Sequence, residues 1–304
     1  MRTIVVGTRK SKLAMTQTNW VIDRLKEMEP NLTVELEKIV TKGDKILDVT
    51  LSKVGGKGLF VKEIESALLN GEIDLAVHSM KDLPAEMPEG LMIGAIPVRE
   101  DVRDCFLSRD GSTLEELPSG AIVGTSSLRR QAQILAIRPD LRVESIRGNI
   151  DTRVQKMRDG QFDAIILATA GLNRISWQED IAELISVKTM LPAVGQGALA
   201  IQCREGDRET RALLVKINHE ETARAVRAER AFLQAFNGGC HLPIAAYAQI
   251  CENQVHLKGL VGDPAGKKMI ADTIIGKNEI KMGQELANRL IELGADELLA
   301  SVSV

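Results

Sequence analysis

The strongest constraint on the fold is a short pattern that occurs twice, in which an apolar strand runs directly into a polar helix start. The first copy is Ile4-Val5-Val6-Gly7-Thr8-Arg9, and the second is Ala121-Ile122-Val123-Gly124-Thr125-Ser126. The first N–H groups of such a helix have no partner within the helix, and the helix dipole favours an anion beside them. The repeat therefore predicts two similar half-sites, each suited to a carboxylate or a phosphate.

Hydroxyl and guanidinium side chains follow both turns. Ser11, Ser126 and Ser127 can add hydroxyl donors, and an arginine can bind a carboxylate through two parallel N–H bonds. Arginines recur after predicted strands and at predicted helix starts, at Arg9, Arg129, Arg130, Arg147, Arg153 and Arg174. A solvated helix face is the plain alternative for Arg129-Arg130. Arginines at several strand ends together predict a polyanionic ligand.

Composition limits the class of partner. The chain has 304 residues, which exceeds one ordinary core and fits two or three domains. Its 39 Lys and Arg against 42 Asp and Glu give a net charge of -3, and only 3% of the residues are aromatic, so nucleic acid is a poor candidate. The sequence shows neither a signal peptide nor an apolar run of about 20 residues, so we expect a cytoplasmic protein that does not bind membranes.

The cysteines and histidines do not form a metal-binding pattern. The four cysteines, Cys105, Cys203, Cys240 and Cys251, show no C-x-x-C spacing. The four histidines show no H-E-x-x-H or similar ligand set. We therefore expect reduced thiols and no protein-held metal.

Periodicity predicts an α/β opening. Residues 2–8 and 33–40 are expected to be strands, with an amphipathic helix over 13–28 between them. Residues 41–58 combine glycines and lysines without periodicity, which is typical of a long mobile loop or lid. A helix over 61–69 and a strand over 75–77 follow, and the strand leads into His78, Ser79, Lys81 and Asp82.

A second α/β unit is predicted after Pro97. Its expected strands are 121–123, 142–145 and 164–167, and its expected helices are 127–137 and 150–158. The strand at 198–203 is expected to return to the first sheet, and residues from about 220 onward read as an α+β unit. We thus predict two α/β lobes of the periplasmic-binding-protein type with hinge crossings and a smaller C-terminal domain. The domain ranges are 1–97 with 198–215, then 98–197, then 216–304.

Two places could carry chemistry. Lys81-Asp82 follows a strand end, where the carboxylate could stabilise a cation and pass a proton to a leaving group, although a solvated surface pair is the plain alternative. Cys240 follows Asn237-Gly238-Gly239, which would present its thiol at a loop tip, although most lone cysteines are inert. His78 alone is better explained as a packed histidine than as a base.

Seven short segments, in order along the chain, resemble those of a known protein family. Together they span essentially the whole chain. They are Gly7-Thr8-Arg9-Lys10-Ser11-Lys12-Leu13-Ala14, Lys53-Val54-Gly55-Gly56-Lys57-Gly58-Leu59-Phe60, His78-Ser79-Met80-Lys81-Asp82-Leu83-Pro84, Gly124-Thr125-Ser126-Ser127-Leu128-Arg129-Arg130, Arg147-Gly148-Asn149-Ile150-Asp151-Thr152-Arg153, Val194-Gly195-Gln196-Gly197 and Gly238-Gly239-Cys240. In these segments the chain resembles the hydroxymethylbilane synthases, also called porphobilinogen deaminases. His241 and Leu242 after the cysteine are ordinary variation.

This resemblance implies a transferase of porphyrin and haem biosynthesis. Enzymes of the family join four porphobilinogen molecules head to tail, release ammonia each time and yield linear hydroxymethylbilane. The cofactor would be a dipyrromethane built from the substrate and attached through a thioether to Cys240. Asp82 would be catalytic, protonating the departing amine and stabilising the positive pyrrole, and Lys81 would pair with it or with the cofactor. Nothing in the sequence demands a partner subunit, so we expect a monomer.

The resemblance assigns the remaining site residues by analogy. The implied cofactor-binding set is Ser79, Lys81, Asp82, Thr125, Ser126, Ser127, Arg129, Arg130, Arg153 and Gln196. The implied substrate-binding set is Arg9, Ser11, Gln17, Arg147, Arg153 and Arg174. Lys53, Lys57 and Phe60 would belong to a lid.

Two rival interpretations remain open at this point. A two-lobed anion-binding module without chemistry would also explain the paired Gly-Thr turns, but it would not explain Asp82 and Cys240 together. An enzyme with a free cysteine nucleophile lacks an identifiable histidine partner beyond His241.

Overall fold

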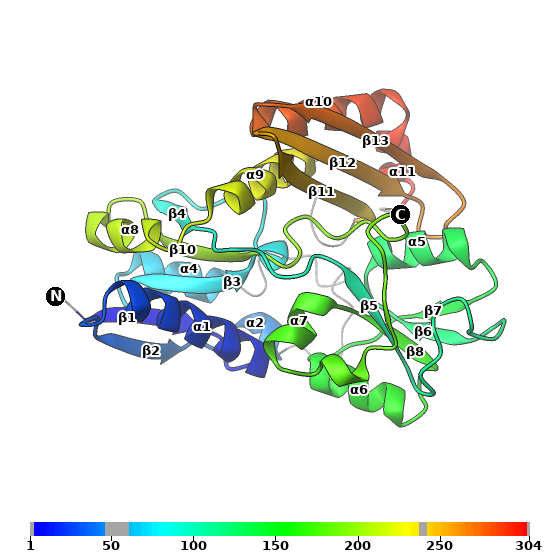
Figure 1. Ribbon diagram of the computed structural model, residues 1–304, viewed down its shortest axis with the longest axis horizontal. Helices are drawn as coiled ribbons and strands as arrows, with labels where there is room; N and C mark the ends of the chain where they lie inside the picture. The colour runs from blue at the N-terminus through cyan, green and yellow to red at the C-terminus, as the bar shows by residue number, and fades with distance from the viewer. Residues whose placement is uncertain (1–2, 46–60, 237–241, 303–304) are drawn as a thin grey trace. The chain divides into compact units, whose positions relative to one another are not determined.

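The computed structural model describes residues 3–45, 61–236 and 242–302, which carry three separate β-sheets (Figure 1). By its contacts the chain divides into two compact units. The first unit comprises Met1–Arg99 and Ala198–Ala223, and the second comprises Glu100–Gly197 and Arg224–Val304. The predicted lid residues Lys53, Lys57 and Phe60 and the predicted attachment residue Cys240 lie outside the described residues.

The first unit is built on a mixed sheet in the order β2-β1-β3-β10-β4. Strand β1 pairs in parallel with β2 and β3, and β10 pairs antiparallel with β3 and β4. The strand expected to return late in the chain therefore does so, at an interior position. The strands are β1 (Ile4–Thr8), β2 (Val34–Lys38), β3 (Leu75–Ser79), β4 (Leu91–Ala95) and β10 (Leu199–Arg204).

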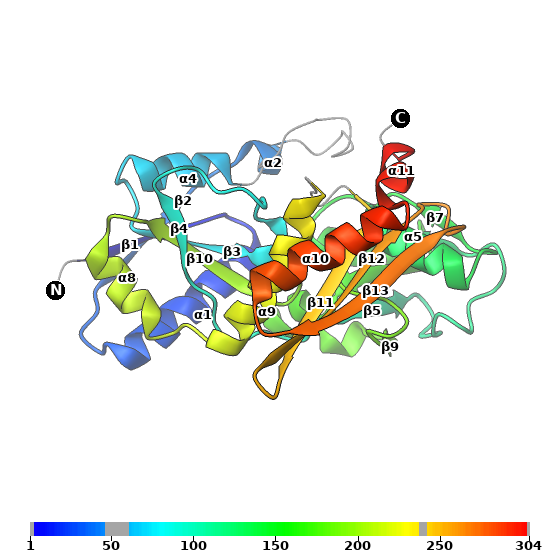
Figure 2. The same ribbon diagram turned by 90° about the horizontal axis from the view of Figure 1, so that it is seen from above.

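Helices cover both faces of this sheet (Figure 2). Helix α1 (Lys12–Met28) buries Val21, Ile22 and Leu25 at helical spacing, and α8 (Arg208–Val215) shares their hydrophobic cluster. Helix α4 (Lys62–Leu69) packs in a second cluster with Ile73 and Ala76. A short 3₁₀ helix η1 (Met80–Asp82) follows β3 directly.

The prediction of a loop over 41–58 is wrong where the structure describes that segment. Lys42–Lys45 forms a helical turn, α2. The backbone N–H of Lys42 donates to Glu63 Oε1 at 3.1 Å, and the preceding Thr41 is fully buried. This tertiary anchor, which local composition does not reveal, orders the start of the segment.

The second unit contains a mixed sheet in the order β7-β6-β8-β5-β9. Its strands are β5 (Asp104–Ser108), β6 (Ile122–Gly124), β7 (Arg142–Glu144), β8 (Ala164–Ala168) and β9 (Glu183–Leu184). Its helices are α5 (Leu128–Ile137), α6 (Ile150–Arg158), α7 (Thr169–Arg174) and the 3₁₀ helix η2 (Gln178–Asp180). The sequence analysis did not predict β5, because all five of its residues are buried and it shows no alternation.

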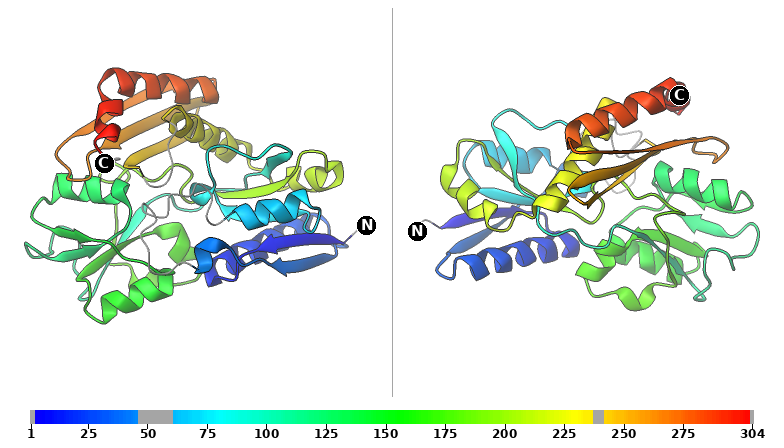
Figure 3. Two further views of the ribbon diagram at one scale, coloured as in Figure 1. Left: turned by 180° about the vertical axis from the view of Figure 1, so that it is seen from behind. Right: turned by 45° about the horizontal axis from the view of Figure 1, so that its top comes forward.

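A three-stranded antiparallel meander also belongs to the second unit. It consists of β11 (Ile244–Cys251), β12 (Gln254–Gly262) and β13 (Met269–Gly276), and α10 (Glu279–Glu292) runs along it (Figure 3). Helix α9 (Glu220–Ala235) contributes Phe232 to the same core, and α11 (Ala295–Ala300) follows α10. Gly259 allows the Phe232 ring to pack closely, because a Cβ at residue 259 would lie 2.6 Å from that ring and the ring would have to shift.

The expected fold class is confirmed. Two mixed α/β sheets are present, and the C-terminal part of the chain forms an antiparallel sheet with helices. The three-domain ranges stay a prediction. The contacts themselves group the C-terminal sheet with the second α/β sheet.

Candidate functional site

Two predicted strand ends of the first unit lie at one edge of its sheet. Strands β1 and β3 are parallel neighbours that end at Thr8 and Ser79, so both chains leave the sheet at the same edge. Arg9 and Ser11 follow the first strand, and the segment with Lys81 and Asp82 follows the second as η1. Carboxyl ends of neighbouring parallel strands are where α/β sheets bind ligands.

A side-chain pair connects these two strand ends. Gln17, on the first half of α1, is 3% exposed. Its Nε2 donates to Ser79 Oγ at 3.0 Å, and Ser79 Oγ donates back to Gln17 Oε1 at 3.3 Å. Ser11 caps α1 by accepting the Ala14 N–H at 3.3 Å, so its own hydroxyl proton is not used in that cap. The structure thus brings Gln17 and Ser79 together at this edge.

Beneath the end of β3 lies a buried polar chain. His78 Nε2 is 3.0 Å from Gln202 Oε1, and Gln202 Nε2 donates to Glu65 Oε1 at 3.1 Å. Burial lowers the pKa of His78 to about 4, with a smaller contribution from Arg9, against the opposing effect of the Gln202 hydrogen bond. Burial also raises the pKa of Glu65. His78 is therefore a neutral packed histidine near neutral pH, in agreement with the structural interpretation of this residue.

The second unit gathers its site residues at one sheet edge in the same way. Strands β7, β6 and β8 are parallel neighbours, so the segments that follow them leave from one edge. Strand β5 runs antiparallel to β8, and its first residue, Asp104, is paired with Ala168, the last residue of β8. This edge therefore holds residues 125–127, 145–147, the start of α7 and Asp104.

Asp104 forms the centre of a buried cluster with two of the predicted arginines. Its Oδ2 accepts from Arg129 Nη1 at 2.8 Å. Its Oδ1 accepts from Arg130 Nε at 3.0 Å, from Arg130 Nη2 at 2.8 Å and from Gln196 Nε2 at 3.0 Å. Asp104 and Gln196 are 0% exposed, and Arg129 and Arg130 are 3% and 6% exposed. The sequence analysis missed Asp104, whose only local signal is an acidic residue at the start of an apolar run.

The two arginines differ in what they have left to donate. The Arg130 guanidinium donates from each of its three nitrogens, to Asp104 and to the Ile166 carbonyl. Within the described part of the chain, the Arg129 guanidinium donates only from Nη1, to Asp104 and to the Leu191 carbonyl. Its Nε is buried and has no hydrogen-bond partner among the described residues. Arg129 therefore keeps one side of its planar fork available for a carboxylate.

The hydroxyl residues of the second Gly-Thr turn are all hydrogen-bonded, Thr125 and Ser127 within the turn and Ser126 to the segment after β7. Thr125 Oγ1 accepts the Ser127 N–H at 3.2 Å, and Ser127 caps α5 by accepting the Arg130 N–H at 3.5 Å. Ser126 is exposed, and its Oγ lies 2.6 Å from the Ile146 carbonyl oxygen and 2.8 Å from Ser145 Oγ. In both strand-to-helix turns a serine, Ser11 or Ser127, caps the helix that follows, a role that the sequence analysis did not predict.

The remaining predicted arginines lie at nearby turns of the second unit. Arg153 Nε donates to the Gly148 carbonyl at 2.9 Å, which folds the first turn of α6 against the segment that holds Arg147. Arg174, at the end of α7, donates from Nη2 to the Gly197 carbonyl at 2.7 Å. Burial lowers the pKa of Arg174 to about 10, although Glu100 opposes this shift.

The Gly195-Gln196-Gly197 turn connects several of these groups. Gln196 Nε2 donates to the Val102 carbonyl at 2.8 Å as well as to Asp104. Gly197 has a φ of +87°, and a Cβ there would lie 2.4 Å from the Glu100 carbonyl oxygen, so only glycine fits. The Gly195 N–H donates to Glu229 Oε2 at 2.7 Å, and Glu229, which the sequence analysis also missed, is 0% exposed.

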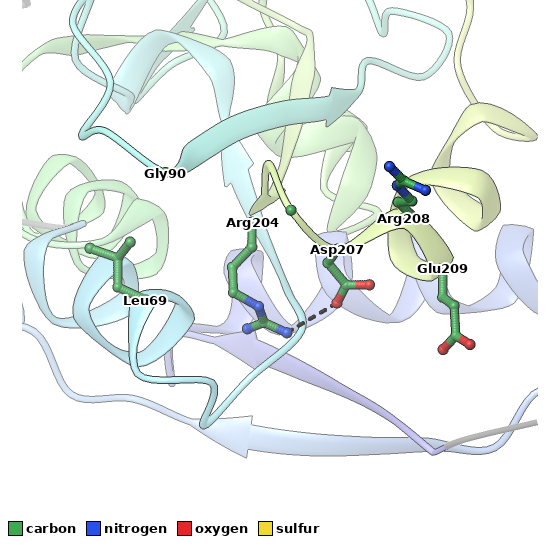
Figure 4. Close-up of a pocket in the computed structure, with 7 residues that line it drawn as sticks. Leu69, Gly90, Arg204, Asp207, Arg208 and Glu209 are labelled. Carbon is green, nitrogen blue, oxygen red and sulfur yellow. Dashed lines mark hydrogen bonds and ion pairs between the residues drawn. The ribbon is translucent and has the colours of Figure 1, made fainter.

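A separate surface pocket lies in the first unit (Figure 4). Arg204 and Asp207, which line it, form an ion pair of 3.1 Å, and the exposed Arg208 and Glu209 also belong to its lining. Arg204 is also held by Asp74 and by two backbone carbonyls. The pocket contains none of the predicted site residues, and its charges balance, so it has no preference for a polyanion.

Two further observations concern the described part of the chain. Among those residues no three His, Cys, Asp or Glu side chains are grouped so that they could hold a metal ion. No described helix combines the length and the apolar character needed to cross a membrane.

The fold and these side chains define a class of protein: two α/β sheets that present guanidinium and hydroxyl donors at strand ends, with an additional C-terminal α+β part. Family models identify the particular family. "Porphobilinogen deaminase, dipyromethane cofactor binding domain" matches residues 4–212, and "Porphobilinogen deaminase, C-terminal domain" matches residues 223–292. The chain belongs to the porphobilinogen deaminase family.

Curated relatives agree over the full length. The chain is 59% identical over 298 residues to "Porphobilinogen deaminase" of Brevibacillus brevis, which covers 98% of this chain and 96% of that protein. It is 58% identical over 305 residues to "Porphobilinogen deaminase" of Bacillus cereus strain B4264, covering 100% and 99%. The protein is thus a transferase of tetrapyrrole biosynthesis with a dipyrromethane-binding domain, and porphobilinogen is the substrate of its family.

Solved structures with a similar arrangement have low identity. The Bordetella pertussis BvgS VFT2 domain aligns with a TM-score of 0.43 at 17% identity, covering 73% of this chain and 90% of that chain. A nutrient-binding protein from Burkholderia cenocepacia bound to methionine aligns with a TM-score of 0.43 at 14% identity, covering 70% and 90%.

Proposed function

We propose that the reaction of this family proceeds here by stepwise head-to-tail condensation of four porphobilinogen molecules on a dipyrromethane attached to the Cys240 thiol. The observation that carries the proposal is the Arg129 guanidinium, which is buried, positively charged and unpartnered at Nε among the described residues. A buried guanidinium with a free N–H is stabilised by an anion, and carboxylates match its geometry.

The residues of the second sheet edge fit a carboxylate-bearing cofactor. Arg129 supplies a free N–H, Ser126 is exposed, and Arg153 stands on the first turn of α6. We assign cofactor carboxylates to this edge. When bound, the dipyrromethane supplies a covalently held pyrrole end that is extended by one unit at each condensation. The full proposed set is Ser79, Lys81, Asp82, Thr125, Ser126, Ser127, Arg129, Arg130, Arg153 and Gln196.

Asp82 is the proposed catalytic carboxyl group. It lies in η1 directly after β3, is exposed, and follows Lys81 in the chain. In our proposal it delivers a proton to the amine nitrogen that leaves the substrate, and its carboxylate then stabilises the positive charge on the substrate pyrrole. Lys81 is proposed to pair with the cofactor or with Asp82.

Charge neutralisation is the proposed task of the remaining arginines. Each porphobilinogen brings an acetate and a propionate, so negative charge accumulates as the product grows. We assign incoming carboxylates to the substrate-binding set Arg9, Ser11, Gln17, Arg147, Arg153 and Arg174. Lys53, Lys57 and Phe60, which lie outside the described residues, are proposed lid residues.

Intact-mass measurement of the untreated protein tests the proposed attachment. The mass of the wild-type chain should exceed its sequence mass by two linked pyrrole units, and Cys240→Ser should remove that excess. Cys251→Ser is the matched control, because Cys251 is an exposed free cysteine on β11 and should not affect the excess. An active wild-type protein without added mass would contradict the attachment and would favour noncovalent binding.

We further propose that this protein is a monomeric, cytoplasmic enzyme. Sedimentation at micromolar concentration tests the first. A mass of twice the 33.2 kDa chain would contradict it.

A further inference from the structure

A buried carboxylate of the second unit stands at the centre of the cluster described above, and none of the roles assigned so far includes it. We propose that Asp104 is a positioning residue, which holds Arg129 and Arg130 in the orientation that binds the carboxylates of the dipyrromethane. This inference rests on the function proposed above. In this role Asp104 affects loading of the cofactor through the two arginines, without touching the cofactor itself.

The first argument is geometric. Both oxygens of Asp104 are engaged, because Oδ1 accepts two bonds from Arg130 and one from Gln196 while Oδ2 accepts from Arg129. Because Arg129 is held at Nη1 alone, its Nε side points away from the shared carboxylate. Asp104 therefore determines which edge of Arg129 remains available to a ligand.

The second argument is electrostatic. Asp104 stays ionised, because the two guanidiniums lower the pKa of its carboxyl group well below the ordinary value despite burial. One negative charge then faces two positive charges, so the cluster of Asp104, Arg129 and Arg130 carries a net charge of +1 when both arginines are protonated. Burial lowers the pKa of Arg129, and the neighbouring Arg130 adds a smaller effect in the same direction, which Asp104 opposes. One carboxylate from a ligand would balance the cluster.

The third argument concerns what happens without Asp104. Without the Asp104 carboxylate, the neighbouring guanidiniums of Arg129 and Arg130 would repel each other. Each would then turn toward other acceptors. The Leu191 and Ile166 carbonyls, which already accept from these arginines, cannot supply charge. Removal of Asp104 should therefore disturb cofactor loading more than it disturbs substrate binding.

The test compares Asp104→Asn with a matched control in the first unit. Asp74→Asn is suitable because it too removes a carboxylate that is paired with an arginine. Asp74 accepts from Arg204 at 2.8 Å and from the Val5 backbone N–H at 2.9 Å. Each variant is purified as the full chain, and three quantities are measured: the fraction of chains that carry the adduct by intact mass, the thermal midpoint, and KM and kcat per adduct-bearing chain.

We expect Asp104→Asn to lower the adduct-bearing fraction by at least about tenfold, since removing one partner of a buried charge pair has large effects. KM for porphobilinogen should stay within about twofold, because the substrate arginines are separate residues. Asp74→Asn should lower the thermal midpoint and leave the adduct-bearing fraction unchanged.

Asp104→Glu keeps the negative charge but displaces it by the length of one methylene group. This variant tests the positioning role of Asp104 if Asp104→Asn does not fold. We expect a partial loss of adduct in Asp104→Glu, with KM unchanged. A normal adduct-bearing fraction in the folded variants, or a loss no larger than that in Asp74→Asn, would overturn the inference. A wild-type protein without adduct would remove the basis of both proposals, and the wild-type sample alone reveals it.

Discussion

Gln17 and Ser79 form two mutual hydrogen bonds, of 3.0 and 3.3 Å, that join α1 to the last residue of β3. Ser79 is followed at once by η1, which holds Lys81 and Asp82. The bonds therefore fix the point from which the proposed catalytic segment leaves the sheet. Side chains mounted on such a rigid strand end can be held in a reactive orientation.

Ser79→Ala should reduce both stability and turnover. The amide of Gln17, which is 3% exposed, loses its partner, which costs about 1–3 kcal/mol of unfolding free energy. Turnover should fall by about tenfold, because the start of η1 is less well positioned. Denaturant unfolding and kcat measure the two effects. Ser66→Ala is the control, because Ser66 bonds only its own helix at an exposed site, and normal turnover in Ser79→Ala would contradict the positioning role.

Asp82→Asn should suppress ammonia release by at least about a hundredfold, the lower range for loss of a general acid. The adduct should persist, because Asn keeps the shape of the side chain and Asp82 is not the attachment residue. Turnover and intact mass of the same sample measure both. Glu89→Gln, an exposed carboxylate in the following loop, should behave as the wild type. Near-normal release of ammonia by Asp82→Asn would rule out the proton-transfer role.

The stability of the protein should decrease as the pH falls from 6.5 toward 4. His78 has a folded-state pKa of about 4 against 6.5 in the unfolded chain, so the unfolded state binds more protons within this window. Its contribution to stability is complete above pH 6.5 and is lost progressively below it, by up to about 3 kcal/mol.

Glu65 acts in the opposite direction, because its raised pKa makes the folded state bind more protons above pH 4.5. The effect of His78 is therefore isolated by comparison with His78→Gln, which can still bond Gln202. Denaturant unfolding at several pH values should give a flatter curve for the variant between pH 4 and 6.5. Parallel curves for the two proteins would show that His78 is not the group responsible.

Sequence reasoning predicted those parts of the fold that local patterns encode. The helix now seen as Lys12–Met28 carries an apolar stripe, so its type and its approximate ends were predictable. Strand β5 was not predictable in this way, because it is buried along its whole length.

The site residues that the sequence analysis missed interact with residues far away in the sequence. Asp104 meets Arg129 across 25 positions and Gln196 across 92 positions, and His78 meets Gln202 across 124. No local pattern marks such pairs, because the sheet order brings them together only in the folded chain. The arginines themselves were predictable from their places after strands, but the carboxylate that orients two of them was not.

Arg147→Ala and Arg153→Ala should each stall elongation before the product is complete. Arg153 Nε is bonded to the Gly148 carbonyl at 2.9 Å, which holds the turn carrying Arg147 against the start of α6. If these guanidiniums neutralise incoming carboxylates, their loss should hinder additions at which negative charge has accumulated.

Intact mass during turnover should then show chains that exceed the adduct mass by whole pyrrole units. Arg142→Ala is the control, because Arg142 is an exposed strand residue whose 3.1 Å pair with Glu144 contributes little. Normal product rates in both variants would mean that Arg147 and Arg153 support the turn rather than the growing chain.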